Sequence, residues 1–109
     1  MLMNTEFKLD GGDVIPAVGL GLWKIDGDAT ADAVRNAVEI GYRHIDAACD
    51  YGNESEAGEG IRQSIDSGMV TREQLWVTSK LWNTYHRADH VRMACEKTLS
   101  DLQLDYLDL

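Results

Sequence analysis

Short runs of alternating apolar and polar residues open the chain and predict a hairpin followed by a strand. Residues 7–9 and 14–15 form two brief apolar runs, separated by Asp10-Gly11-Gly12-Asp13. We expect these runs to pair as a hairpin, because the two glycines supply the positive φ values that a tight turn needs. Pro16 closes this unit, and a buried strand is expected over residues 17–22.

After the hairpin, the chain alternates between helical and strand patterns. Apolar residues recur at spacings of three and four in three segments, which predict helices over residues 28–40, 55–67 and 89–102. Short runs rich in β-forming residues predict strands over residues 42–47 and 75–80. A further strand is expected to begin at Tyr106.

Polar residues and glycines indicate where the helices begin and end. Asp28 or Thr30 is expected to cap the first helix, and Gly41 lies just past its end. Residues 71–74 have the character of a capping box. The residues that the third helix is expected to turn toward a core are Val91, Cys95, Leu99 and Leu102.

Strict alternation of strand and helix predicts an α/β fold with a parallel sheet and right-handed crossovers. A doubly wound sheet and a closed barrel both produce this order, and periodicity does not choose between them. A closed barrel needs about 250 residues, so a chain of 109 residues would supply fewer than half of its strands. We therefore expect a fragment of a larger domain, with an open sheet edge and an uncovered apolar face. A small self-contained α/β domain is the alternative.

Composition limits the class of protein. Apolar residues make up 44% of the chain and charged residues 27%, which is typical of a globular protein, and the net charge of −9 disfavours nucleic acid or an anionic membrane as partner. The first residues do not resemble a signal peptide, and no apolar run is long enough to span a bilayer. Cys49 and Cys95 lack the spacing of a zinc site, so we expect no metal, and unpaired thiols indicate a reducing, cytoplasmic location.

Three ionisable side chains fall at or beyond predicted strand ends. Asp46 lies near the end of one strand, Lys80 ends the next, and Tyr51 lies in the loop between them. Consecutive parallel strands are often neighbours about 4.8 Å apart, so Asp46 and Lys80 are expected to form an ion pair beneath Tyr51. A lysine ammonium lowers the pKa of a nearby tyrosine from about 10, which suits proton donation to a carbonyl oxygen. A purely stabilising ion pair beside a packed tyrosine is the alternative.

The segment that carries Asp46 and Tyr51 also resembles a family signature. Residues 41–58, GYRHIDAACDYGNESEAG, are similar to the first signature of the aldo-keto reductases, G-[FY]-R-x-x-D-x-[AS] followed by a tyrosine, Asn-Glu and a glycine. Residues 19–24, 79–82 and 102–109 resemble further segments of the family in the same order, and the aldose- and xylose-reductase-like branch is the most similar. The resemblance implies that residues 1–109 are the N-terminal part of a (β/α)8 TIM barrel: a preceding β-hairpin, strands 1–3 with their helices, and the start of strand 4.

The resemblance also implies roles for individual residues. Tyr51 would be the general acid, Lys80 would lower its pKa, and Asp46 would pair with Lys80 and meet the cofactor ribose. The residues implied to lie along the cofactor NADPH are Gly21, Leu22 and Trp23. The residues implied to line the substrate pocket are Trp23, Tyr51 and Trp82. Both tryptophans have the alternative of being ordinary core residues.

The function implied by the resemblance is reduction of an aldehyde, ketone or aldose to an alcohol with NADPH. This activity is expected of the full-length parent, because the chain stops at Leu109, before the catalytic histidine that ends the fourth strand in the family. His44, His86 and His90 are expected to be ordinary structural or surface residues. The alternative is a non-catalytic barrel module that senses nucleotide or binds a partner. Substrate identity, preference for NADPH over NADH and oligomeric state stay open.

Overall fold

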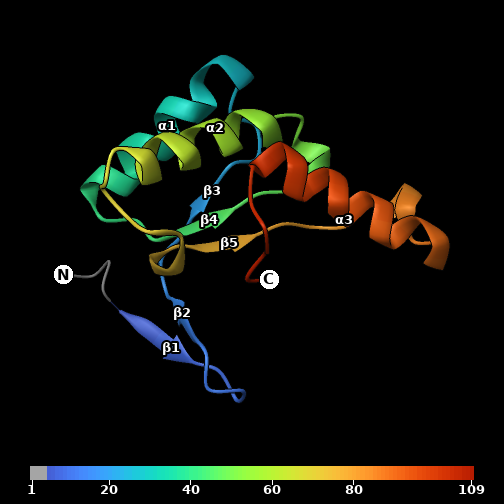
Figure 1. The fold of residues 1–109 in the computed structure, drawn as a ribbon, viewed down its shortest axis with the longest axis horizontal. Coiled ribbons are helices and arrows are strands. Elements are labelled where there is room, and N and C mark those ends of the chain that lie inside the picture. The colour runs from blue at the N-terminus through green and yellow to red at the C-terminus, as the bar shows by residue number, and fades with distance from the viewer. Residues whose placement is uncertain (1–4) are drawn as a thin grey trace.

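The computed structural model describes residues 5–109 as a hairpin, a small parallel sheet and three α-helices (Figure 1). The antiparallel hairpin consists of β1 (Glu6–Lys8) and β2 (Val14–Pro16). The parallel sheet consists of β3 (Leu20–Gly21), β4 (His44–Asp46) and β5 (Trp76–Thr78), in that order. The helices are α1 (Gly27–Ile40), α2 (Glu54–Asp66) and α3 (Ala88–Leu102).

The hairpin and the alternation of strand and helix are confirmed, but the strands are shorter than the sequence predicts. The strand expected over residues 17–22 is reduced to Leu20–Gly21, which pairs with β4 alone. Apolar character continues beyond the paired residues because the flanks are also buried, and a burial pattern does not reveal where the hydrogen-bonded ladder stops. In the hairpin turn, only the second of the two glycines, Gly12, has a positive φ, at 97°.

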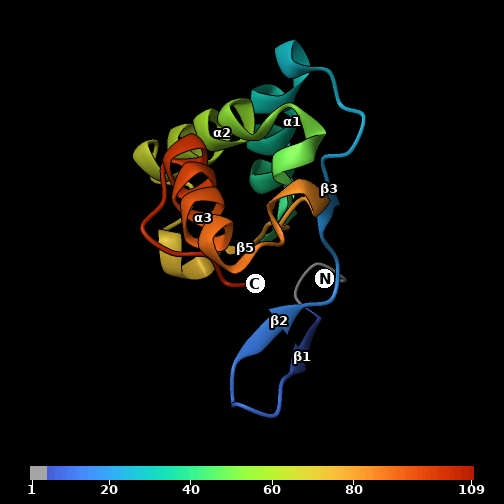
Figure 2. The same cartoon turned by 90° about the vertical axis from the view of Figure 1, so that its right-hand side faces the viewer.

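The sheet has the order of a barrel wall. Each strand lies beside the strand that precedes it in the chain, and the helices gather on one side of the sheet in both views (Figures 1 and 2). A doubly wound sheet reverses its strand order and carries helices on both faces, whereas a barrel keeps all its helices outside. The arrangement therefore decides between the two folds that the periodicity left open, in favour of the barrel.

The segment expected to begin a fourth strand runs beside β5 without forming a regular strand. Backbone hydrogen bonds join Asp108 N to Val77 O at 3.0 Å and Ser79 N to Leu109 O at 3.0 Å. The carboxylate of Asp108 accepts from Val77 N at 2.8 Å and from Arg72 at 2.9 Å. The Asp108 side chain thus binds the Val77 N–H, which a regular ladder would pair with a backbone carbonyl. Residues 108–109 nevertheless lie next to β5, where the following strand of the sheet is expected.

The core lies between the sheet and the helices. Its largest fully buried apolar side chains are Leu22, Ile45, Ile61, Leu102, Val34, Val38 and Val77. Two glycines of α2 allow the helices to approach: a Cβ on Gly60 would lie 2.7 Å from Ala31 O of α1, and one on Gly58 would lie 2.7 Å from Leu102 Cα of α3. None of the helices within residues 5–109 combines the length and the apolarity needed to cross a membrane.

The predicted helix ends are partly right. Gly41 ends α1 with φ 118°, and Thr71 forms the predicted capping box. The predicted caps of α1 are wrong: Asp26 is the N-cap residue and makes no side-chain cap bond, while Asp28 lies inside the helix. The buried hydroxyl of Thr30 instead donates to Asp26 O at 2.8 Å, because its position inside the first turns places it over the preceding carbonyls.

The prediction for the inner face of α3 holds only for its C-terminal part. Leu102 is fully buried, but Val91 remains 42% exposed and Cys95 is also exposed. Both residues line a cavity of about 150 Å³ between α3 and the segment 79–81 that follows β5, instead of packing in the core. The helix contacts the body of the protein through its last turns, where Gly58 admits it, and its first half stands away from the sheet (Figure 1).

Replacing Gly60 tests the helix contact. Gly60→Ala gains helix propensity of about 1 kcal/mol, but the new methyl group would lie 2.7 Å from Ala31 O and 2.8 Å from Val34 Cβ. Overpacking of this kind costs about 1–3 kcal/mol, so we expect a net loss of unfolding free energy, measured by urea denaturation. Gly27→Ala is the matched control, since its methyl group meets only the flexible end of Glu56 at 3.4 Å. Equal effects of the two substitutions would contradict the packing argument.

Candidate active site

Two neighbouring parallel strands and the turn between them bring the predicted trio together. Asp46 is the last residue of β4, and it lies opposite Thr78, the last residue of β5. Lys80 follows two residues beyond that strand end. Tyr51 closes a short 3-10 turn, Cys49–Tyr51, directly after β4. The trio therefore gathers at the carboxyl ends of the strands, where barrel enzymes carry their active sites.

The Lys80 ammonium lies between its two predicted partners. Its Nζ donates to Asp46 Oδ1 at 2.5 Å and to Ala47 O at 3.0 Å, and it lies 5.0 Å from the centroid of the Tyr51 ring. The side chains of Lys80 and Asp46 are 47% and 39% exposed. Ion pairs with this exposure stabilise a fold by about 1 kcal/mol or less. A contribution to stability therefore does not explain this ion pair well. Its position at the strand ends fits a catalytic role better.

The surroundings keep Lys80 charged. Partial burial alone would lower the pKa of Lys80, but the hydrogen bond to Asp46 and the nearby phenol of Tyr51 outweigh burial and raise it above its ordinary value. A lysine whose pKa is raised carries its proton throughout the neutral range. A permanent positive charge thus stands beside the Tyr51 ring.

The residues predicted to lie along the cofactor continue from the end of β3. Gly21 pairs in register with Asp46, and a Cβ added to Gly21 would meet no atom of residues 5–109 within 4 Å, so this strand end borders open space in the described part of the chain. Trp23 follows in the loop with 66% of its surface exposed, and the Lys24 ammonium lies 4.7 Å from its ring. Leu22 is fully buried, backbone included, and its carbonyl oxygen accepts from Asn53, so it offers no open surface here.

The remaining aromatic candidate and the histidines are placed as follows along the chain. Trp82 stands two residues beyond Lys80, before the turn Asn83–Tyr85, and is 41% exposed. His44 lies inside β4 and bonds Thr78 Oγ1 at 3.0 Å through its Nε2. His86 and His90 lie before and at the start of α3. No group of three or more side chains in residues 5–109 has the arrangement of a metal site.

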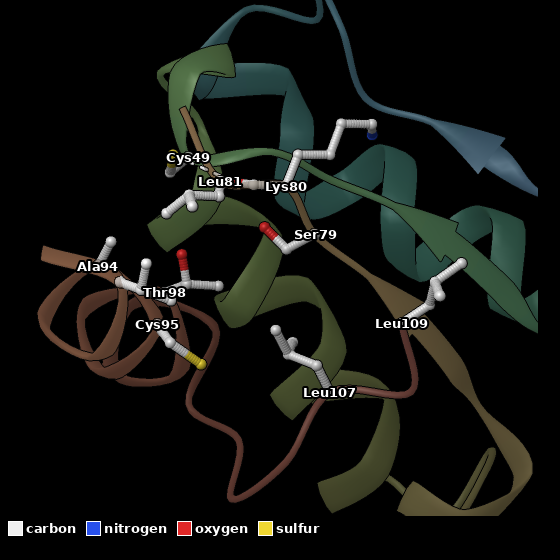
Figure 3. Close-up of a pocket in the computed structure, with 10 residues that line it drawn as sticks. Cys49, Ser79, Lys80, Leu81, Ala94, Cys95, Thr98, Leu107 and Leu109 are labelled. Carbon is white, nitrogen blue, oxygen red and sulfur yellow. Dashed lines mark hydrogen bonds between the residues drawn. The ribbon is translucent and has the colours of Figure 1, made fainter. Parts of the chain in front are cut away.

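The cavity between α3 and the segment 79–81 that follows β5 adjoins the site through the backbone of Lys80. Figure 3 shows Cys95 and Thr98 of α3 on one side of it, while the side chain of Lys80 leads away from them. The Lys80 ammonium therefore points toward Asp46 and Tyr51 and away from this cavity.

Three polar contacts around the trio were not predicted. The amide of Asn53 donates to the loop after β3, the hydroxyl of Ser79 donates to Glu54 Oε2 at 2.7 Å, and the thiol of Cys49 donates to Lys80 O at 3.3 Å. The sequence contains Asn53 and Glu54 only as part of the family-like segment. Polar residues at the start of a helix are usually exposed. The sequence therefore does not predict that Asn53 and Glu54 are only 1% and 5% exposed.

Known proteins share much of the sequence of this chain. Residues 17–109 match the model of the aldo/keto reductase family. An NADPH-dependent aldose reductase of Saccharomyces cerevisiae is 53% identical over 107 residues, which are 98% of this chain and 33% of the relative. An NADPH-dependent D-xylose reductase of Meyerozyma guilliermondii is 52% identical over 104 residues, 95% of this chain and 33% of the relative.

A solved structure shows the same fold. The crystal structure of a Bombyx mori aldo-keto reductase in complex with NADP superposes with a TM-score of 0.90 at 42% identity, over 94% of this chain and 36% of that one. The chain thus spans about a third of the length of the relatives that it matches. Matches of this length and identity show the family of the chain. They also confirm the α/β barrel arrangement that the sequence predicts.

Glu54 provides a test of the electrostatics beside the trio. Burial raises its pKa, against the hydrogen bonds of Ser79 and Thr98 and the charge of Lys97, while Asp101 raises it further. A raised folded-state pKa means that stability is fully present below the unfolded value of about 4.3 and is lost as pH rises through the folded value.

Glu54→Gln removes this titration and keeps an oxygen for Ser79. Its unfolding free energy, from urea denaturation, should equal that of the wild type below the unfolded pKa of Glu, exceed it increasingly as pH rises through the raised folded-state pKa of Glu54, and then exceed it by a constant amount. Glu39→Gln, on an exposed part of α1, is the control and should show no such trend. A difference that stayed constant over the whole pH range or shrank with rising pH would refute the assignment.

Proposed function

Because the chain belongs to the aldo/keto reductase family, we propose that the complete protein reduces an aldehyde, ketone or aldose carbonyl to an alcohol with NADPH. The observation that carries this proposal is the Asp46–Lys80 contact of 2.5 Å, with the Tyr51 ring 5.0 Å from the same ammonium. The two relatives, 53% and 52% identical, are NADPH-dependent by name and support the same activity.

The chain has suitable residues for a nicotinamide cofactor at the end of β3. Gly21 borders open space beside Asp46, so a ligand can approach the backbone there. The exposed ring of Trp23 offers an apolar surface next to it. Gly21, Trp23 and Asp46 are the residues that we assign to this contact, whereas the fully buried Leu22 would support it only from behind. Bound NADPH supplies the two electrons and the hydrogen that reduce the carbonyl carbon.

Tyr51 is the proposed proton donor to the carbonyl oxygen. When its phenol gives up the proton, the phenolate left behind lies beside the Lys80 ammonium, and two unit charges 4 Å apart near a protein surface attract by about 4 kcal/mol. The partial exposure of Lys80 reduces this value, but about 1.4 kcal/mol is already a tenfold effect on rate. Asp46 holds the ammonium in place, so all three residues act on one proton transfer.

Trp23 and Trp82 are proposed as walls of the substrate pocket, together with Tyr51. Core tryptophans are buried, whereas these two are 66% and 41% exposed and follow the ends of β3 and β5. Exposed aromatic rings beside a polar trio suit a small carbonyl compound, which needs apolar contact and one hydrogen-bond donor. The names of the relatives indicate sugars as the substrate class.

The alternative function is a non-catalytic module that senses nucleotide or binds a partner. Loss of chemistry would remove the need for a charged lysine beside a tyrosine, and the presence of all three residues speaks against it. Turnover of a carbonyl substrate by the complete protein would exclude this alternative.

Tyr51→Phe in the complete protein tests the assignment. The substitution removes the proton donor and keeps the ring, so we expect kcat/KM to fall by about 10²–10⁴, followed as loss of NADPH absorbance. Tyr42→Phe makes the same change before β4, at the opposite end of that strand, and should leave turnover unchanged. Wild-type turnover by Tyr51→Phe would refute the role of this residue.

A further inference from the structure

A buried amide connects the segment that carries Tyr51 to the loop that carries Trp23. Asn53 is only 1% exposed, and its Nδ2 donates to Leu22 O at 2.9 Å and to Ile25 O at 3.0 Å. A side-chain amide nitrogen has two hydrogens, and both are used here. The four-residue loop that starts at Leu22 is therefore held at both of its ends by one side chain.

That loop does not hold its shape by local preference alone. Lys24 has φ 64°, a left-handed conformation that non-glycine residues adopt at a cost. The loop's own turn bond, from Ile25 N to Leu22 O, is long at 3.3 Å. Trp23 points outward and has 66% of its surface exposed, so core packing does not fix it. Core packing holds the two ends of the loop, because Leu22 is fully buried and Ile25 packs against the core. The two hydrogen bonds from Asn53 join these ends beneath the strained Trp23–Lys24 segment.

The position of Asn53 in the chain gives this contact a consequence for the site. Asn53 follows Tyr51 by two residues, with Gly52 between them at φ 74°. The segment of residues 51–53 therefore carries Tyr51 and also binds the loop of Trp23 through the Asn53 amide. Movement of the Tyr51 segment relative to the Trp23 loop would have to break the hydrogen bonds of the Asn53 amide.

We propose that Asn53 is a positioning residue that holds the Trp23–Lys24 loop in register with Tyr51, and so sets how tightly the site binds its carbonyl substrate. The proposal rests on the proposed function for the role of Trp23. Asn53 does not touch the reacting atoms, and it acts through the two carbonyls that it binds. Its loss should loosen one wall of the site while the Asp46–Lys80 pair, which β4 and β5 hold, stays in place.

Asn53→Asp is the sharpest variant because it keeps the shape and removes both donors. An ionised carboxylate would face the oxygens of Leu22 and Ile25 and repel them. Hydrogen exchange of the complete protein should then show amides of residues 22–26 exchanging about tenfold faster or more. Amides of residues 44–46 and 76–78 serve as the internal reference and should keep their wild-type rates.

Kinetics provide the second readout. We expect Asn53→Asp to raise KM for the carbonyl substrate by about tenfold with a smaller fall in kcat, because binding is weakened more than proton transfer. Lowering the pH should partly restore slow exchange in the loop, since a protonated aspartic acid regains one donor. Ser55→Asp adds the same charge at an exposed position two residues further on and should change neither readout.

The outcomes separate the possibilities. Wild-type exchange of residues 22–26 in Asn53→Asp would overturn the proposal, as would an equal rise in exchange in residues 44–46 and 76–78, which would show a general structural role. Asn53→Ala, which buries no charge, is measured in parallel and must also accelerate the loop selectively if the proposal holds. A wild-type protein without NADPH-dependent carbonyl reduction would remove the proposed function, and the exchange measurement would still decide whether Asn53 holds the loop.

Discussion

The parallel pairing of β4 with both of its neighbours is the constraint on which the site depends. Asp46 lies opposite Gly21 of β3 on one side and Thr78 of β5 on the other, so three strands end at the same level. From that level, each strand releases a different loop: Trp23 follows β3, Tyr51 follows β4, and Lys80 follows β5. A shift of β4 by one residue would turn Asp46 to the opposite face of the sheet and abolish its contact with Lys80.

Helix packing maintains this pairing from outside the sheet. The strands are only two or three residues long, so their ladders contribute few hydrogen bonds. The buried apolar cluster beneath α1 and α2 supplies most of the stabilisation. Gly58 and Gly60 allow α2 to approach both of its neighbours, because at either position a side chain would overlap the backbone of the adjacent helix. Close packing of the helices on the buried apolar cluster therefore helps to keep the short strands in register.

The sequence predicts the order of the elements, the hairpin and the trio, because these follow from local spacing. The ends of the strands and the cap of α1 depend on which backbone groups find partners, and residue types alone do not reveal that. The face of α3 was predicted from apolar spacing, yet Val91 stays 42% exposed because the first half of the helix stands away from the sheet. The choice of a barrel needed the family-like segment or the observed strand order, and the burial of Asn53 needed the structure.

Several unfavourable features of the structure lie beside the trio. Among residues 5–109, Asn53 Oδ1 and Glu54 Oε1 are buried without a hydrogen-bond partner, and Lys24 has a left-handed backbone nearby. Each such feature costs about 1–3 kcal/mol, more than the half-exposed Asp46–Lys80 pair returns. A sequence shaped for stability alone would place apolar residues at these positions. Buried atoms without a partner also occur elsewhere in residues 5–109, at Arg72, Trp76 and His90. Those beside the trio are of the kind that a preorganised site requires, since side chains held rigidly for a reaction cannot also relax to their most stable arrangement.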